Sequence, residues 1–194
     1  MGRRRQDRFG KQARLDGYPA RSVYKLEEID RRTQLLRKGQ RVLDLGAAPG
    51  SWTLYAAEKV GPTGKVVAID LQPIEIDVPD YVTLIAGDAR EAELEGPFDV
   101  VLSDMAPKTS GQRAADQYRS YELVMVALEA ARKHLKPGGA LVAKIFQGAE
   151  FDDARTAFRE TFEKVRVIRP KAVRDESYEV FLLGLGRRPL TPSE

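Results

Sequence analysis

Apolar residues follow two alternating patterns from residue 41 onward. Short runs rich in Val, Ile and Leu, typical of buried strands in a parallel sheet, alternate with stretches in which apolar residues recur every three or four positions, as in helices. The runs predict seven strands, at residues 41–45, 65–70, 82–86, 99–103, 140–146, 165–168 and 179–185. We therefore expect an α/β fold with a seven-stranded, mostly parallel sheet and helices on both faces.

Four helices are predicted around the sheet, at residues 20–34, 51–60, 118–134 and 151–162. The first places Val23, Leu26 and Ile29 on one face, and Ser51 is a suitable N-cap for the second. The third carries apolar residues that we expect to face the core, at Leu123, Val126, Ala127, Ala130 and Ala131.

Other segments lack these patterns. Residues 1–17 are polar and basic and residues 187–194 are polar, so we expect a tail at each end of a single domain that spans residues 1–194. The connections at 71–81 and 89–98 leave no room for long helices. One face of the sheet is therefore expected to be thinly covered.

Composition excludes several classes of protein. No run of about eighteen apolar residues suggests a membrane span, and no apolar stretch follows the first residues as in a signal peptide, so we expect a cytoplasmic protein. The chain contains no cysteine and a single histidine, His134. Disulfides, thiolate zinc sites, a cysteine nucleophile and a histidine metal cluster are therefore not expected.

Charge is distributed unevenly along the chain. The formal net charge is +3, but residues 1–41 alone hold 13 Lys and Arg against 5 Asp and Glu. Such a basic segment favours a polyanionic partner, because Lys and Arg displace the counterions condensed on phosphates. The alternative is a solvated basic tail without a partner.

The first predicted strand ends in a glycine loop typical of a nucleoside-cofactor site, Asp44-Leu45-Gly46-Ala47-Ala48-Pro49-Gly50. It lacks the middle glycine of the dinucleotide fingerprint, and Pro49 removes an N–H that a pyrophosphate would need. S-adenosylmethionine fits better, with Asp44 favouring its positively charged end. The candidate cofactor contacts in the loop are Asp44, Gly46, Ala47, Pro49 and Gly50.

Aspartates end the next strands as well. Asp70 is placed to accept hydrogen bonds from the ribose hydroxyls of an adenosine, and Asp88 to accept one from the adenine amino group. With Asp44 and Asp104, they follow four successive strands, whose carboxyl ends meet at one edge of a parallel sheet. This arrangement predicts a class I, Rossmann-like methyltransferase that uses S-adenosylmethionine.

Two further residues indicate which kind of chemical group accepts the methyl group. Lys144 interrupts an otherwise apolar strand, and burying an unpaired ammonium group is costly, so the site must require it. Asp104 lies in Ser103-Asp104-Met105-Ala106-Pro107, unlike the Asn/Asp-Pro-Pro-aromatic stretch with which many methyltransferases hold an exocyclic amine. The acceptor is therefore not expected to be a base nitrogen.

The strings at 22–25, 44–50, 103–107 and 142–148 resemble those of the FtsJ/RrmJ ribose 2′-O-methyltransferases, and the resemblance covers roughly residues 8–188. It implies a catalytic tetrad of Lys25, Asp104, Lys144 and Glu179, with Lys144 as the proton acceptor. It also implies cofactor contacts from Gly50, Trp52, Asp70, Asp88 and Asp104. The implied substrate is large-subunit rRNA, at a uridine in the loop that receives aminoacyl-tRNA, within a ribosomal particle. The stretch 89–98 is shorter than in the bacterial members, which puts the assignment to one substrate within the family in doubt.

The tetrad also makes chemical sense by itself. Methyl transfer to an alcohol needs the hydroxyl aligned and its proton removed as the bond forms, which a neutral lysine can do. Burial and the ammonium of Lys25 disfavour the charged form of Lys144, while Asp104 and Glu179 oppose them. Lys25 would orient the ribose and stabilise the negative charge that develops on its oxygen.

We expect RNA as the partner, because RNA has the 2′-hydroxyl and DNA does not. The basic N-terminal segment can bind the RNA phosphates. Its basic residues are Arg3, Arg4, Arg5, Arg8, Lys11, Arg14 and Arg21. The expected form is a monomer without membrane contact. Three alternatives remain at this stage: a 2′-O-methyltransferase of tRNA or of an mRNA cap, a methyltransferase of a small molecule or protein, and a non-catalytic RNA-binding module.

Overall fold

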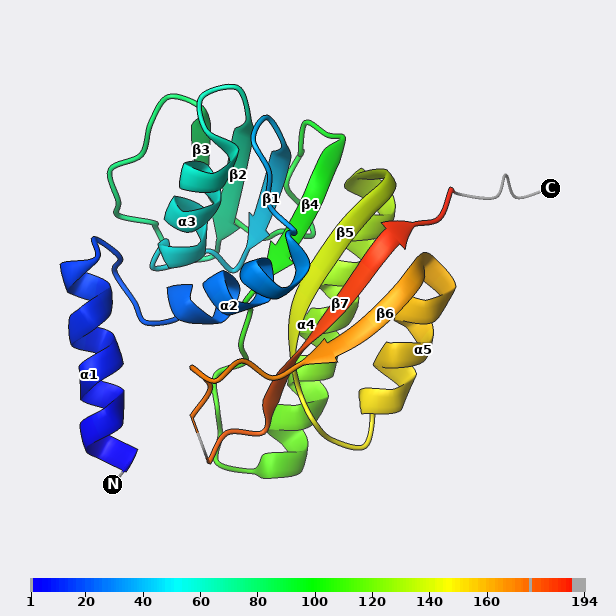
Figure 1. Cartoon of the computed structure of the whole chain (residues 1–194). Helices are drawn as coiled ribbons and strands as arrows, with labels where there is room; N and C mark the ends of the chain where they lie inside the picture. Colours follow the sequence, from blue (N-terminus) through cyan, green and yellow to red (C-terminus); the bar gives the residue numbers. More distant parts are fainter. Residues whose placement is uncertain (1, 175, 190–194) are drawn as a thin grey trace.

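The computed structural model describes residues 2–174 and 176–189. Seven strands form one sheet in the order β3-β2-β1-β4-β5-β7-β6, which confirms the expected α/β fold (Figure 1). Strands β1 to β5 are parallel, and β7 runs antiparallel between β5 and β6. Their bounds are β1 Arg41–Leu45, β2 Lys65–Asp70, β3 Val82–Ala86, β4 Phe98–Ser103, β5 Leu135–Phe146, β6 Phe162–Ile168 and β7 Glu179–Arg187.

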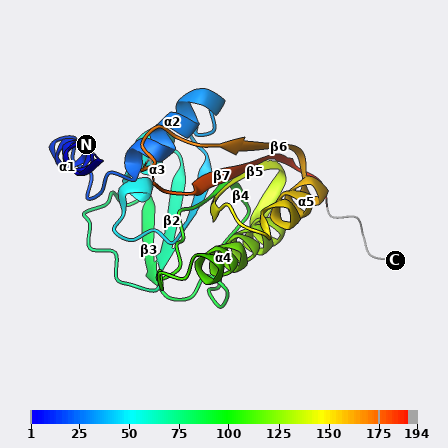
Figure 2. The same ribbon diagram turned by 90° about the horizontal axis from the view of Figure 1, so that it is seen from below.

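Helices cover both faces of the sheet, as Figure 2 shows: α2 (Val23–Thr33) and α3 (Ser51–Val60) on one face, α4 (Arg113–His134) and α5 (Phe151–Thr161) on the other. Side chains alternate between the faces along each strand, so neighbouring residues belong to different cores. Val42 packs with α2 and α3, whereas Leu43 packs with α4 and α5. The fold thus has two separate apolar layers.

Thin cover was expected for one whole face of the sheet, but helices cover both faces, and cover is thin only at the edge formed by β3. Neither connection that flanks β3, residues 71–81 and 87–97, contains a helix, and Val82 is the only buried residue of the strand. These connections lie instead at the carboxyl ends of β2 and β3, where they help to form the site described below.

The expected N-terminal tail is wrong, because Gly2–Leu15 form helix α1. Ala13 is fully buried, and the ring of Phe9 lies 5.8 Å from that of Tyr24. The hydroxyl of Tyr24 donates a hydrogen bond of 2.7 Å to Asp16 just after the helix. Packing against α2 therefore orders a segment whose composition alone is that of a tail.

The C-terminal tail begins later in the structure than the sequence predicts. β7 continues to Arg187, which pairs with Phe162 at the start of β6. Residues 190–194 of that tail lie outside the described residues.

Some element ends differ from the prediction for local reasons. Helix α4 starts at Arg113, five residues early, and Val124 and Leu128 are its large buried side chains. β5 starts at Leu135 because that residue pairs with Phe98 ahead of an irregularity in the register. Ser51 is not the N-cap of α3, since its hydroxyl instead exchanges hydrogen bonds with the backbone of Ala20.

Candidate active site

An open cavity of about 1020 Å³ lies at the carboxyl ends of β1 to β4. Five of the predicted cofactor residues line it: Gly46, Pro49, Asp70, Asp88 and Asp104. The other four, Asp44, Ala47, Gly50 and Trp52, are buried behind its wall. The strand ends therefore converge as the parallel topology requires, but the residues divide into a lining set and a supporting set.

Asp70 is held in a fixed position at the end of β2. One carboxylate oxygen accepts a hydrogen bond of 3.0 Å from the backbone N–H of Ala48, and the other accepts one of 2.8 Å from the N–H of Gln72. The glycine loop and the next connection thus orient this carboxylate toward the cavity. Each oxygen keeps a lone pair for a hydroxyl donor.

Asp88 carries an ion pair that the sequence patterns do not predict. The guanidinium of Arg90 contacts both carboxylate oxygens, with Nη2 at 2.5 Å and Nε at 3.0 and 3.1 Å. Hydrogen bonds from the Arg90 side chain, then from its backbone N–H, lower the pKa of Asp88 to about 2. The carboxylate is therefore ionised at any physiological pH, and the only sequence signal was an arginine two residues further on.

Asp44 is fully buried beneath the glycine loop. The hydroxyl of Thr53 donates a hydrogen bond of 2.7 Å to Oδ2, whereas the buried Oδ1 has no hydrogen-bond partner. Burial raises the pKa of Asp44 to about 7, against the lowering effect of Thr53, and the charges of Asp104 and Asp70 raise it further. A positive charge bound nearby would stabilise the ionised form.

Two loop glycines are needed for contacts within the protein. A Cβ atom at Gly46 would lie 2.4 Å from Cγ of Met105, and one at Gly50 would lie 2.5 Å from Cδ1 of Ile76. Both residues also have positive φ, +73° and +108°. The glycines therefore let the loop pack against the segments that follow β4 and β2.

Trp52 is part of the core and does not line the cavity. Its indole N–H donates a hydrogen bond of 2.9 Å to the carbonyl of Ser22, just before α2, and its ring lies 5.7 Å from that of Phe181. The ammonium of Lys25 lies 5.8 Å from the centroid of the same Phe181 ring. Trp52 thus supports the helix that carries Lys25.

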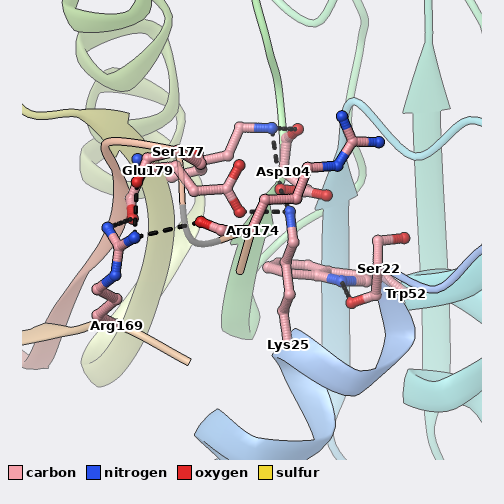
Figure 3. A network of polar contacts seen from close by, with 9 residues as sticks. Ser22, Lys25, Trp52, Asp104, Arg169, Arg174, Ser177 and Glu179 are labelled. Carbon is pink, nitrogen blue, oxygen red and sulfur yellow. Dashed lines mark hydrogen bonds and ion pairs between the residues drawn. The ribbon is translucent and has the colours of Figure 1, made fainter. Parts of the chain in front are cut away.

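The four predicted catalytic residues come together beside the cavity, and Figure 3 labels three of them, Lys25, Asp104 and Glu179. Lys144 Nζ, from β5, lies 3.0 Å from Asp104 Oδ1 and donates a hydrogen bond of 2.6 Å to the Asp104 carbonyl. Lys25 Nζ, from α2, lies 2.5 Å from Glu179 Oε1 and 4.0 Å from Asp104 Oδ1. The four side chains are 5–18% exposed, so two ammonium groups and two carboxylates alternate in one buried cluster.

Comparison with known proteins supplies the family. Residues 18–187 match the FtsJ-like methyltransferase family. The chain belongs to this family. It is 55% identical over 190 residues to Ribosomal RNA large subunit methyltransferase E of Sorangium cellulosum, with 95% of this chain and 90% of that one covered. The protein of the same name from Oleidesulfovibrio alaskensis is 49% identical over 193 residues, covering 95% and 93%.

Solved structures share the fold of this FtsJ-like methyltransferase. A ribosomal RNA methyltransferase structure from Plasmodium falciparum superimposes with a TM-score of 0.76 at 24% identity, covering 88% of this chain and 98% of the other. Fibrillarin of Aeropyrum pernix with bound S-adenosyl-L-methionine gives a TM-score of 0.61 at 18% identity, covering 78% and 68%. The family resemblance seen in the sequence is confirmed.

Sequence reasoning missed the contribution of α4 to the FtsJ-like site. Leu123 and Val126, which we expected in the core, line the cavity instead. The periodicity shows that α4 has an apolar face, but the rotation of the helix against the sheet decides which of those residues pack in the core and which reach the cavity.

The sequence patterns also did not predict a structural role for Arg169. Its guanidinium donates hydrogen bonds to the carbonyls of Arg174, Ser177 and Glu179, at 3.3, 2.6 and 3.3 Å (Figure 3). The segment that enters β7 is thereby folded back, which fixes the backbone of Glu179. No sequence pattern marks a residue that works through carbonyl groups.

Two kinds of feature are absent from the part of the methyltransferase that the structure describes. Residues 2–174 and 176–189 contain no cluster of three or more His, Asp or Glu side chains that could hold a metal ion. No helix among them is long and apolar enough to cross a membrane.

Proposed function

We propose that this methyltransferase transfers a methyl group from S-adenosylmethionine to a ribose 2′-hydroxyl of large-subunit ribosomal RNA, at a uridine in the loop that receives aminoacyl-tRNA. The observation that carries the proposal is Lys144, an amine that is 5% exposed within an apolar strand and is aimed at Asp104 beside the cavity. The names of the close relatives support ribosomal RNA as the substrate. All four tetrad residues belong to one chain, which suits a monomer acting on a ribosomal particle.

The cavity residues fit S-adenosylmethionine. Asp70 would accept hydrogen bonds from the two ribose hydroxyls, and Asp88 one from the adenine amino group. The unpartnered oxygen of Asp44 would stabilise the positive end of the cofactor from below the loop. Gly46 and Pro49 would line the cofactor, while Ala47, Gly50 and Trp52 would hold the loop and α2 in place. When bound, the cofactor supplies an electrophilic methyl group.

Lys144 acts as the proton acceptor in this proposal. As a neutral amine, Nζ has two N–H groups, which match its two oxygen neighbours, the carbonyl and Oδ1 of Asp104. Its lone pair then stays available for the substrate. Lys144 Nζ would accept the proton of the 2′-hydroxyl as that oxygen takes the methyl group, whose bond to the cofactor's sulfur breaks at the same time, so that sulfur is left as a neutral thioether and the positive charge passes to the Lys144 ammonium.

The other tetrad residues position the reacting groups. Asp104 orients the Lys144 amine through two contacts. Glu179 holds Lys25 at 2.5 Å, so the Lys25 ammonium is fixed where it can donate to the ribose oxygen as negative charge develops. In this proposal, a hydrogen-bond donor and a proton acceptor contact the same hydroxyl.

The test uses a substrate that lacks only the acceptor oxygen. The wild-type protein is incubated with S-adenosylmethionine and large ribosomal subunits, tRNA or capped RNA, and the methylated nucleotide is mapped. We expect methylation of the large subunit, which is abolished when that nucleotide is replaced by its 2′-deoxy form. Transfer to tRNA or cap alone would change the substrate, and transfer that survives the deoxy substitution would refute ribose methylation.

A further inference from the structure

Three side chains form a cluster at the rim of the tetrad that belongs to neither apolar core. We call Arg113, Phe146 and Tyr178 the rim cluster. The ring centroids of Phe146 and Tyr178 are 5.0 Å apart with the rings at 73°, and the guanidinium carbon of Arg113 lies 4.9 Å from the Tyr178 ring centroid. Arg113 is exposed and the two rings are half-buried. The cluster therefore presents aromatic and guanidinium surface to the outside.

Each member of the rim cluster is connected through the chain or by strand pairing to a tetrad residue. Tyr178 directly precedes Glu179, and Phe146 is the cross-strand partner of Glu179. Phe146 also follows Lys144 by two positions, so both side chains point to the same side of β5. Arg113 begins α4 at the end of the segment that follows Asp104.

The contact between Arg113 and Tyr178 joins segments far apart in the sequence. In Figure 1, the green segment that leads into α4 and the orange segment that leads into β7 approach each other at the lower end of the molecule. The contact brings the aromatic ring next to Glu179 and the guanidinium at the start of α4 together on the outside of the molecule.

We propose that the rim cluster is a stacking site for the base of the nucleotide whose ribose is methylated. The inference rests on the proposed function, because a ribose at the tetrad must carry its base one bond away. Single-stranded or flipped RNA bases are bound by stacking on aromatic rings and on guanidinium planes, the two surfaces present here. The target nucleotide is therefore taken out of its helix and its base rests on Tyr178 next to Arg113.

Replacement of Tyr178 tests this directly. Tyr178→Ala should raise the KM for RNA about 5- to 150-fold, the range that base–aromatic stacking gives on alanine substitution. Cofactor affinity, measured by calorimetry, should not change. Tyr178→Phe keeps the ring and should restore the RNA affinity. Tyr118→Ala is the matched control, since it removes a half-exposed tyrosine of α4 outside the cluster and should leave KM unchanged.

A substrate without the target base separates stacking from a structural effect. An RNA that lacks the base of the methylated nucleotide should bind the wild type more weakly than the complete RNA does, by about the same factor. The Tyr178→Ala variant should bind this abasic RNA as well as the wild type does. A full additional weakening with the variant would mean that Tyr178 does not touch this base, and would overturn the inference. If the wild type methylates no RNA ribose, the proposed function itself fails, which is a distinct result.

Discussion

Lys144 has a structural cost that its proposed role as proton acceptor would explain. A buried amine is less favourable than a leucine at the same position of β5, and its two contacts to Asp104 offset only part of this. We expect Lys144→Ala to lower the single-turnover rate roughly 10²–10⁴-fold, the range for removal of a general base, while cofactor and RNA affinity stay largely unchanged.

Lys144→Arg distinguishes a base from a fixed positive charge. Arginine keeps the charge and much of the reach but is not deprotonated in proteins, so this variant should be as slow as Lys144→Ala. An arginine variant with near wild-type rates would require that Lys144 act through charge and position instead.

Asp44 makes stability depend on pH in a direction unusual for an aspartate. Its pKa is raised to about 7 in the fold from a reference of 3.8, so the folded state binds the extra proton between these values. Stability must then fall as the pH rises from about 4 to about 7, by ~1.4 kcal/mol per pH unit, and level off above.

The Asp44→Asn variant checks this dependence. The amide removes the titration and keeps an oxygen for the hydroxyl of Thr53. From pH 5 to pH 8, the free energy of unfolding measured in urea titrations should fall in the wild type by on the order of 2–3 kcal/mol more than in the variant. A difference that is the same at both pH values would show that Asp44 does not titrate there.

At the scale of elements, Trp52 connects α3 to the start of α2. Trp52→Phe removes the N–H that binds the carbonyl of Ser22 and should cost about 0.5–1.5 kcal/mol of stability. Because the loosened helix carries Lys25, the methyl-transfer rate should fall while cofactor affinity, followed by calorimetry, stays constant. A selective decrease in cofactor affinity would instead place Trp52 against the cofactor.

Helix α1 offers a second prediction about an element. Replacing Arg8, Lys11 and Arg14 by Gln keeps Phe9 and Ala13, which pack the helix, but removes three positive charges. If α1 binds RNA phosphates, RNA affinity should fall and the slope of log K against log salt should flatten by about 0.7–0.9 for each phosphate that is no longer neutralised. Transfer activity at saturating RNA should persist. An unchanged slope would mean that the basic helix is only solvated.

The elements differ in how well the sequence predicted them, for physical reasons. The predicted bounds of β1 to β4 agree with the structure to within one residue, because buried parallel strands need continuous apolar runs, whereas β5 and β6 begin five and three residues earlier than predicted. Helix α1 was missed because only Phe9 and Ala13 of its described side chains make apolar contacts, too few for a periodic pattern. The strand-end aspartates were predictable from topology, whereas the Arg90 ion pair depends on side-chain directions that no spacing encodes.

At the scale of the whole molecule, cofactor binding should stabilise the fold, because the cavity joins the ends of four neighbouring strands of the sheet. Ligand at a hundred times its Kd adds about 2.7 kcal/mol, or roughly 5–11 °C in Tm for a chain of this size. Asp70→Ala should lower the affinity by about 1.5–3 kcal/mol and reduce the shift by half or more. Equal shifts for wild type, Asp70→Ala and Asp88→Ala would contradict the cofactor site.

The place of β7 has a consequence for biosynthesis. This strand is made after β5 and β6 but lies between them, and β6 pairs with the sheet only through it. While the nascent chain is still short of residue 179, β5 is an open edge, β6 has no strand to join, and the tetrad lacks Glu179. The ribosome must therefore release residues 179–187 from its tunnel before the sheet can close. A partly synthesised chain exposes a strand edge that is prone to aggregation, and its tetrad is incomplete. The pairing of β7 with β5 covers this edge and completes the tetrad in the same folding step.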